Sequence, residues 1–94
     1  MDEILKTLGL AYRARKVILG EEILNRISEV KIMFLASDLS EKSRERYEKK
    51  CFYYGIDHID KYDSQILSAA FGKSNVKTAG VIDKGFKDAI LKKL

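Results

Sequence analysis

The sequence predicts an α/β protein, a three-layer α/β/α sandwich with a four-stranded mixed sheet and about five helices. Segments with apolar residues at helical spacing alternate along the chain with short apolar runs of strand length. One such run, residues 32–36, is apolar at every position, which is typical of a central strand buried on both faces. The 94 residues contain no proline, and no linker or internal repeat interrupts the alternation, so we expect residues 1–94 to form a single domain.

The first half of the chain predicts two helices and two strands. Residues 2–14 form a helix because their apolar side chains share one face, namely Ile4, Leu5, Leu8, Ala11 and Tyr12. Residues 17–19 follow as a short strand. A second helix begins at Gly20 and continues through Ile27. Residues 32–36 then provide the middle of the sheet.

Three later helices are predicted from residues that cap them. The caps are Ser40 before a helix at 41–54, Asp63 before a fourth helix and Asp83 before the last helix. Gly55 and Gly72 supply the stops of the first two of these helices. Residues 56–60, which alternate as a half-exposed strand, and residues 76–82 complete the sheet.

The composition favours a small cytoplasmic protein that is mildly basic. Eighteen Lys and Arg residues against fourteen Asp and Glu residues give a net charge of +4, which is not the pattern of a polycationic tail. A single cysteine excludes an internal disulfide and suits a reducing compartment. The first residues lack the pattern of a signal peptide, and no run approaches the length of a membrane span. We therefore expect a monomer in the cytoplasm that makes no membrane contact.

Catalytic and metal-binding patterns are not found in the sequence. The only histidine, His58, lies in a strand where Asp57 and its ring point to opposite faces, so we expect a plain edge histidine. Cys51 falls where a helix turns inward, which predicts an inert core thiol. Without a nucleophile–base set or a metal-ligand cluster, we expect no enzyme activity, no metal and no cofactor, and binding is the favoured class of function.

The most informative segment surrounds Gly20. Three cations, Arg13, Arg15 and Lys16, precede a short strand, after which Gly20 and the acids Glu21 and Glu22 open a helix. Glycine permits a tight turn and close backbone approach, and a helix start presents free N–H groups. The segment is therefore suited to bind an RNA phosphate. The alternative is an ordinary soluble helix, with Gly20 as its cap and the two acids compensating its dipole. A second loop, residues 72–75, also combines a glycine with cationic and amide side chains.

The chain resembles the bacterial YlxQ-type members of the kink-turn RNA-binding ribosomal protein family, which includes the ribosomal L-seven-A-e and L-thirty-e proteins. The similarity spans nearly residues 4 to 90 in consistent order. The motifs that carry it are Leu8-Gly9-Leu10-Ala11 with Arg13-Ala14, Gly20-Glu21-Glu22, Leu35-Ala36-Ser37-Asp38, Gly72-Lys73 and Asp83-Lys84-Gly85-Phe86. The family's fold is an α/β/α sandwich, in agreement with the reading from periodicity.

The resemblance implies that the partner is structured RNA that contains a kink-turn. Ribosomal RNA is one RNA that could supply it. The Gly20 turn with Glu21 and Glu22 would enter the widened groove of the kinked helix and read its sheared G·A pairs. The residues that would cover the unpaired nucleotides of the bulge are Lys73, Ser74, Asn75 and Val76. Arg26 would meet phosphate at the family's basic position, and the residues that would neutralise the flanking backbone are Arg13, Arg15 and Lys16.

This chain departs from the family at two positions that matter for base reading. Tight kink-turn binders typically have Asn and Glu where this chain has Glu22 and Ile23. A carboxylate accepts hydrogen bonds from guanine but cannot donate as asparagine can, and isoleucine does neither. We therefore expect weakened or redirected base reading.

A protein-docking module, associated with ribosomal or translation proteins, is the alternative function. Four aromatic residues of the helix at 41–54 cannot all face one helical stripe, namely Tyr47, Phe52, Tyr53 and Tyr54. Those that remain outside would form an exposed aromatic patch.

Overall fold

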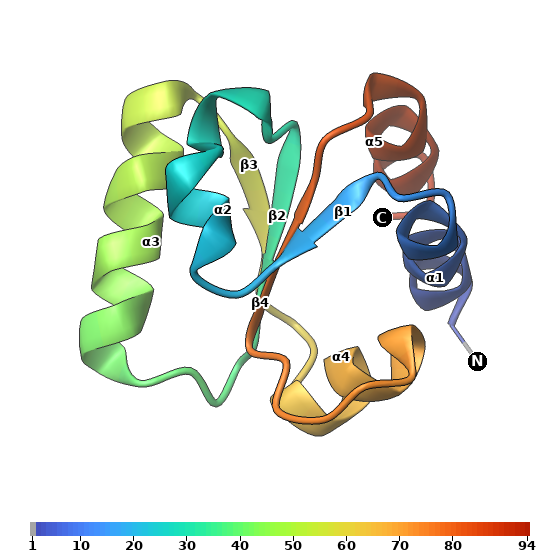
Figure 1. Ribbon diagram of the computed structural model, residues 1–94, viewed down its shortest axis with the longest axis horizontal. Coiled ribbons are helices and arrows are strands. Elements are labelled where there is room, and N and C mark those ends of the chain that lie inside the picture. Colours follow the sequence, from blue (N-terminus) through green and yellow to red (C-terminus); the bar gives the residue numbers. More distant parts are fainter. Residues whose placement is uncertain (1) are drawn as a thin grey trace.

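A four-stranded sheet lies between two layers of helices in the computed structural model, which describes residues 2–94 (Figure 1). The strands are β1 (Val17–Leu19), β2 (Ile32–Leu35), β3 (Asp57–Ile59) and β4 (Thr78–Val81), in the order β1-β4-β2-β3. β4 runs antiparallel to both of its neighbours, whereas β2 and β3 are parallel. The sheet is therefore mixed, and the predicted fold class is confirmed. No helix among residues 2–94 has both the length and the apolar character to cross a membrane.

Each face of the sheet is covered by its own set of helices (Figure 1). One face packs against α1 (Glu3–Arg13), α4 (Ser64–Phe71) and α5 (Lys84–Leu91), and the other packs against α2 (Glu22–Asn25), the short 3₁₀ helix η1 (Ile27–Glu29) and α3 (Glu41–Tyr54). β2 shows why both layers form, because Ile32 and Phe34 enter the first core while Met33 and Leu35 enter the second. The all-apolar run thus lies in the interior of the sheet, as expected.

The helix caps are those that the sequence predicts. The side chains of Ser40, Asp63 and Asp83 each accept a hydrogen bond from a backbone N–H in the first turn of the following helix. Gly55 and Gly72 end α3 and α4 with φ of +66° and +64°. Short polar side chains and glycines therefore fix three of the five helices from local chemistry alone.

Most elements match the predicted bounds to within one residue at each end, and two are shorter than that. The last strand covers four residues instead of 76–82, because the N–H of Val76 donates to the hydroxyl of Ser68 on α4 and not to the sheet. The second helix ends at Asn25, since Arg26 leaves the helical region with φ −123°, and η1 follows. The expectation of one helix from Gly20 through Ile27 is thus wrong.

Candidate nucleic-acid interface

One edge of the sheet brings the Gly20 turn and the loop after α4 together. Here β1, β2 and β3 end and β4 begins. The N–H of Gly20 donates to the carbonyl of Thr78 over 3.1 Å, and the N–H of Ala36 donates to the carbonyl of Lys77 over 2.8 Å. We call this surface the loop edge and define it by residues 20–22, 36–38 and 73–77. Figure 1 shows it below β1 and β4, between the start of α2 and the loop that returns from α4.

Gly20 supplies a left-handed turn between β1 and α2. Its φ is +69°, a conformation that side chains disfavour, and a Cβ placed there would meet no atom within 4 Å. Its carbonyl accepts the first bond of α2, from the N–H of Ile23, whereas Glu21 occupies the cap position and makes no side-chain capping bond. Gly20 therefore shapes the turn and leaves open space beside it, and the alternative in which it simply caps the helix does not describe this geometry.

The loop from Gly72 to Thr78 presents polar groups between the end of α4 and the Gly20 turn, which it reaches at Thr78. Lys73, Ser74, Asn75 and Lys77 are exposed. Val76, which the sequence assigns to the binding surface, is only 7% exposed and packs in the core, so it can offer a ligand little beyond its backbone. A hollow of about 330 Å³ lies between this loop and α4, lined by Ser64, Gln65, Ser68, Ala69, Lys73, Ser74 and Asn75.

The loop edge carries both signs of charge. Glu21 lies 3.6 Å from the guanidinium of Arg46 on α3. Asp38 accepts hydrogen bonds from the hydroxyl and the N–H of Ser64, at 2.6 and 2.8 Å, and these bonds lower the pKa of Asp38. Glu21 and Asp38 therefore each have a partner. Lys77 lies close enough to Asp38 to lower its pKa further, whereas Glu22 is exposed and can contact a ligand. Such a surface suits recognition by shape and polar contact more than attraction by net charge.

Three predicted site residues lie away from the loop edge. Arg15 and Lys16 precede β1, and the carbonyl of Lys16 accepts from the N–H of Ile82 at the far end of β4, so they border the opposite edge of the sheet. The length of β1 separates them from Gly20, roughly 10 Å for three residues. Arg26 ends α2 and forms a two-point ion pair with Glu29, at 2.8 and 2.9 Å, which lowers the pKa of Glu29. The assignment of Arg15 and Lys16 to the flanking RNA backbone and of Arg26 to phosphate stays a prediction, in which these cations act at a distance from the Gly20 turn.

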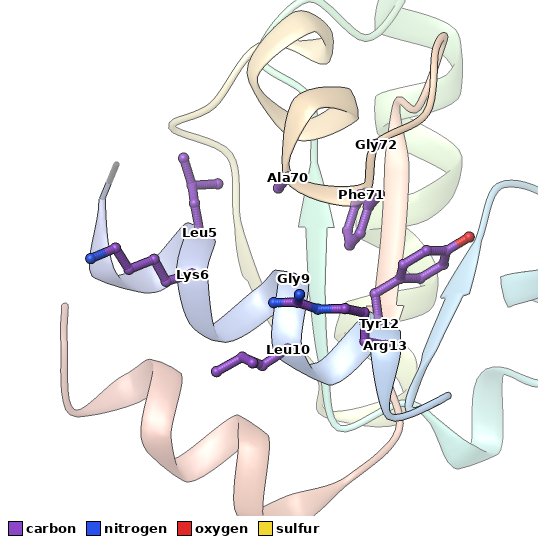
Figure 2. Close-up of a pocket in the computed structure, with 9 residues that line it drawn as sticks. All are labelled: Leu5, Lys6, Gly9, Leu10, Tyr12, Arg13, Ala70, Phe71 and Gly72. Carbon is purple, nitrogen blue, oxygen red and sulfur yellow. The ribbon is translucent and has the colours of Figure 1, made fainter.

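Arg13 takes an intermediate position. It lines a hollow of about 530 Å³ between α1 and the end of α4, which reaches Gly72 (Figure 2). The ring of Tyr12 packs edge-on against Phe71 in this hollow, with their centroids 5.1 Å apart. Gly9 allows the close approach of the two helices, because a Cβ there would lie 3.0 Å from the carbonyl oxygen of Ala70. Arg13 therefore lines the same hollow as Gly72, where α4 ends, and its side chain extends along α1 toward Gly9 (Figure 2).

Sequence reasoning missed two cations at or beside the loop edge. Lys77 directly precedes Thr78, and its position in the same loop as Lys73 was the available signal. Arg46 reaches Glu21 from α3, and no local pattern in the sequence joins these two elements.

The reactive side chains of the chain are placed as structural groups. Cys51 is buried with its sulfur 3.7 Å from that of Met33, and burial raises the pKa of the thiol to about 11, so it is no nucleophile at neutral pH. His58 lies on the edge strand β3, with Nε2 3.6 Å from a carboxylate oxygen of Glu48. Among residues 2–94, no three His, Cys, Asp or Glu side chains are grouped to hold a metal ion.

Comparison with known proteins identifies bacterial relatives of this chain. It is 33% identical to the RNA-binding protein YlxQ of Enterococcus faecium over 88 residues, which are 90% of this chain and 84% of that protein. It is 31% identical to the protein of the same name in Bacillus subtilis (strain 168), over 89% of this chain and 87% of that one. A solved structure of a protein with unknown function from Bacillus halodurans superposes with a TM-score of 0.90 at 30% identity, over 98% of this chain and 96% of the other. No protein-family model matches the sequence. On the strength of the two named relatives, the chain belongs to the YlxQ family.

Proposed function

We propose that this protein binds structured RNA at the loop edge and that its target is a kink-turn or a similarly kinked RNA helix. Both named relatives are RNA-binding proteins by name. The observation that carries the proposal is the hydrogen bond from the N–H of Gly20 to the carbonyl of Thr78, which ties the turn before α2 to the end of the 73–77 loop. Ribosomal RNA in the cytoplasm is the first natural target to consider, with the protein acting as a single chain.

A kinked helix suits this surface because regular RNA cannot be read from its major groove. That groove is deep and narrow, so proteins read RNA sequence where the helix is distorted or unpaired. The open space beside Gly20 lets backbone approach a widened groove closely. Lys73 and Lys77 would contact phosphates. The hollow between α4 and residues 73–75 would take an unpaired nucleotide.

In this proposal, the side chains of Glu21 and Glu22 are the groups that contact the RNA bases. Ile23 stands where tight kink-turn binders have a glutamate, and it is fully buried, so it makes no contact with RNA. Glu22 is exposed, and its carboxylate can accept from the N1 and N2 groups of guanine. The expected mode is therefore acceptor-only reading of guanine with phosphate contacts beside it.

The test is a titration of two RNA duplexes of equal length by fluorescence anisotropy. One contains a kink-turn, and in the other both sheared G·A pairs are replaced by Watson–Crick pairs. We expect the kink-turn to bind at least about tenfold more tightly, because a good base contact is worth about 1–3 kcal/mol. Equal affinities would exclude kink recognition, and no affinity for either duplex would exclude RNA binding at this edge.

A docking function has one observation in its favour. Phe52, Tyr53 and Tyr54 are exposed at the far end of α3, whereas Tyr47 is buried. The aromatic patch that the alternative requires is thus present, at the end of α3 that lies away from the loop edge.

A further inference from the structure

The outer face of α3 carries cations and aromatic rings at helical spacing. This α3 face consists of Lys42, Arg46, Lys49, Lys50, Phe52 and Tyr53, which surround an open hollow of about 820 Å³. All six residues are exposed, and Phe52 and Tyr53 retain 89% and 80% of their accessible surface. The ring of Tyr53 packs edge-on against Tyr54, with their centroids 5.0 Å apart, and still leaves most of its surface open to water, as Phe52 does. A cluster of exposed aromatic rings of this kind is typical of an interaction site.

Most of the positive charge on this face is available to a partner. Of its four cations, only Arg46 has a carboxylate oxygen within 4.0 Å among residues 2–94. Glu45 is the one acid that lines the hollow. The face therefore offers three unpaired ammonium groups next to two exposed rings.

This combination favours RNA over a protein segment as the occupant. The centres of protein–protein interfaces are depleted in Lys and Glu, yet Lys42, Lys49, Lys50 and Glu45 form the larger part of this lining. Surfaces that bind single-stranded nucleic acid combine cations for the backbone with aromatic rings on which bases stack. Charge complementarity and the exposed rings thus point to one chemistry.

The α3 face also begins where the candidate RNA site lies. Ser40 caps α3 just after residues 36–38 of the loop edge, and Arg46 contacts Glu21 of that edge at 3.6 Å. From there the 14 residues of α3 extend roughly 21 Å to the aromatic end. We infer that the α3 face binds a single-stranded RNA segment that continues from the kinked helix, with the lysines on its phosphates and Phe52 and Tyr53 stacked on its bases. This inference rests on the proposed function for the kinked helix, but the single strand can be tested alone.

The experiment measures binding of a fluorescein-labelled twelve-nucleotide oligouridylate by anisotropy at low salt. The unaltered 94-residue chain is compared with the variants Phe52→Ala/Tyr53→Ala and Lys49→Glu/Lys50→Glu. The matched controls are Leu10→Ala, which truncates an exposed apolar side chain on α1, and Lys92→Glu/Lys93→Glu, which reverses two charges after α5. We expect each α3 pair to weaken binding by about tenfold or more, and the controls by less than about threefold. Far-UV circular dichroism checks that each variant is folded.

Three outcomes would overturn the inference. The first is an oligouridylate that does not bind, and the second is a loss that is the same in the control variants, which would indicate diffuse electrostatics. The third is a polyglutamate peptide of equal charge that binds as tightly and is lost in the same variants, which would assign the face to an acidic protein segment. The kink-turn duplex without an overhang is titrated in parallel. That duplex needs no α3 contact, so its failure to bind would count against the proposed function at the loop edge. The oligouridylate titration alone would then test RNA binding by the α3 face.

Discussion

The two edges of the sheet differ in how they hold their charged groups. At the loop edge, chain segments far apart in sequence meet: Lys77 directly precedes Thr78, which bonds the Gly20 turn, and Lys73 lies at the start of the same loop, beside α4. At the opposite edge, Arg15 and Lys16 precede β1, and Arg26 is engaged with Glu29 by two hydrogen bonds. The cations nearest to Gly20 in sequence are thus not its nearest companions in space.

A strand of three residues is enough to place the two halves of the segment around Gly20 at opposite edges of the sheet. β1 has only three residues, yet it carries the chain from one edge of the sheet to the other. A ligand at the loop edge is therefore held by Gly20 and a distant loop, and the cations before β1 can reach it only if the ligand is long enough to span the sheet. RNA helices are long enough, so the two edges have to be compared by experiment.

The largest expected effect compares charge reversal at the two edges. We expect Lys73→Glu/Lys77→Glu to weaken binding of a kink-turn RNA by about 10- to 100-fold and to reduce the slope of log K against log salt by about 0.7–0.9 per lost phosphate contact. Arg15→Glu/Lys16→Glu carries the same change of charge and should cost less than about threefold. Both variants are titrated at several salt concentrations. Equal losses would show that RNA spans both edges.

A smaller effect concerns the two left-handed residues at the ends of β1. Gly20 and Arg15 have φ of +69° and +62°. Gly20→Ala should lower the free energy of unfolding by about 1 kcal/mol, because the new Cβ meets open space and only the backbone is strained. Arg15→Gly should change it by less than about 0.5 kcal/mol, since relief of strain is offset by the greater freedom of glycine in the unfolded chain. Urea denaturation measures both.

RNA binding separates the same two variants. Gly20→Ala should also weaken the kink-turn complex, because the added methyl group occupies the space beside the turn, whereas Arg15→Gly should leave it within about threefold. A complex that loses affinity only in Arg15→Gly would reverse the assignment of the two edges.

The fold was predictable where local chemistry decides it. Ser40 and Gly55 bracket α3 at the predicted residues, and the apolar run of β2 identified an interior strand. The second helix was not predictable in length, because it ends at Arg26 through a backbone conformation that no cap or glycine signals. Likewise, the last strand does not include Val76, because its N–H donates to the hydroxyl of Ser68, which is a tertiary contact.

The candidate site was predictable only in its pieces. Gly20 and the 73–75 loop each carry a local signal, but their proximity depends on the antiparallel pairing of β1 with β4. The periodicity of a segment predicts that it is a strand but not which strand it pairs with. Arg46 was missed for the same reason, since its contact with Glu21 joins α3 to the start of α2 through tertiary packing, whereas Lys77 could have been found from its place in the loop of Lys73.

The smallest expected effect concerns one carboxylate at each edge. Hydrogen bonds from Ser64 lower the pKa of Asp38 at the loop edge, and a hydrogen bond from Arg26 lowers the pKa of Glu29 at the other. Ser64→Ala should raise the first pKa toward its ordinary value, and Arg26→Ala the second, in a carboxyl titration by ¹³C NMR. Because both values are lowered by folding, each group stabilises the protein above its unfolded pKa, and that contribution is lost as the pH falls through the folded pKa.

The same titration repeated with saturating kink-turn RNA distinguishes the edges directly. Phosphates brought near a carboxylate disfavour its charged form, so bound RNA should raise the pKa of Asp38. Glu29 should titrate unchanged as long as Arg26 remains its partner. If the pKa of Glu29 also rises, Arg26 has left it for a phosphate, and the family's basic position operates here after all. If neither pKa changes, the RNA binds elsewhere on the molecule, and the loop edge is excluded as its binding site.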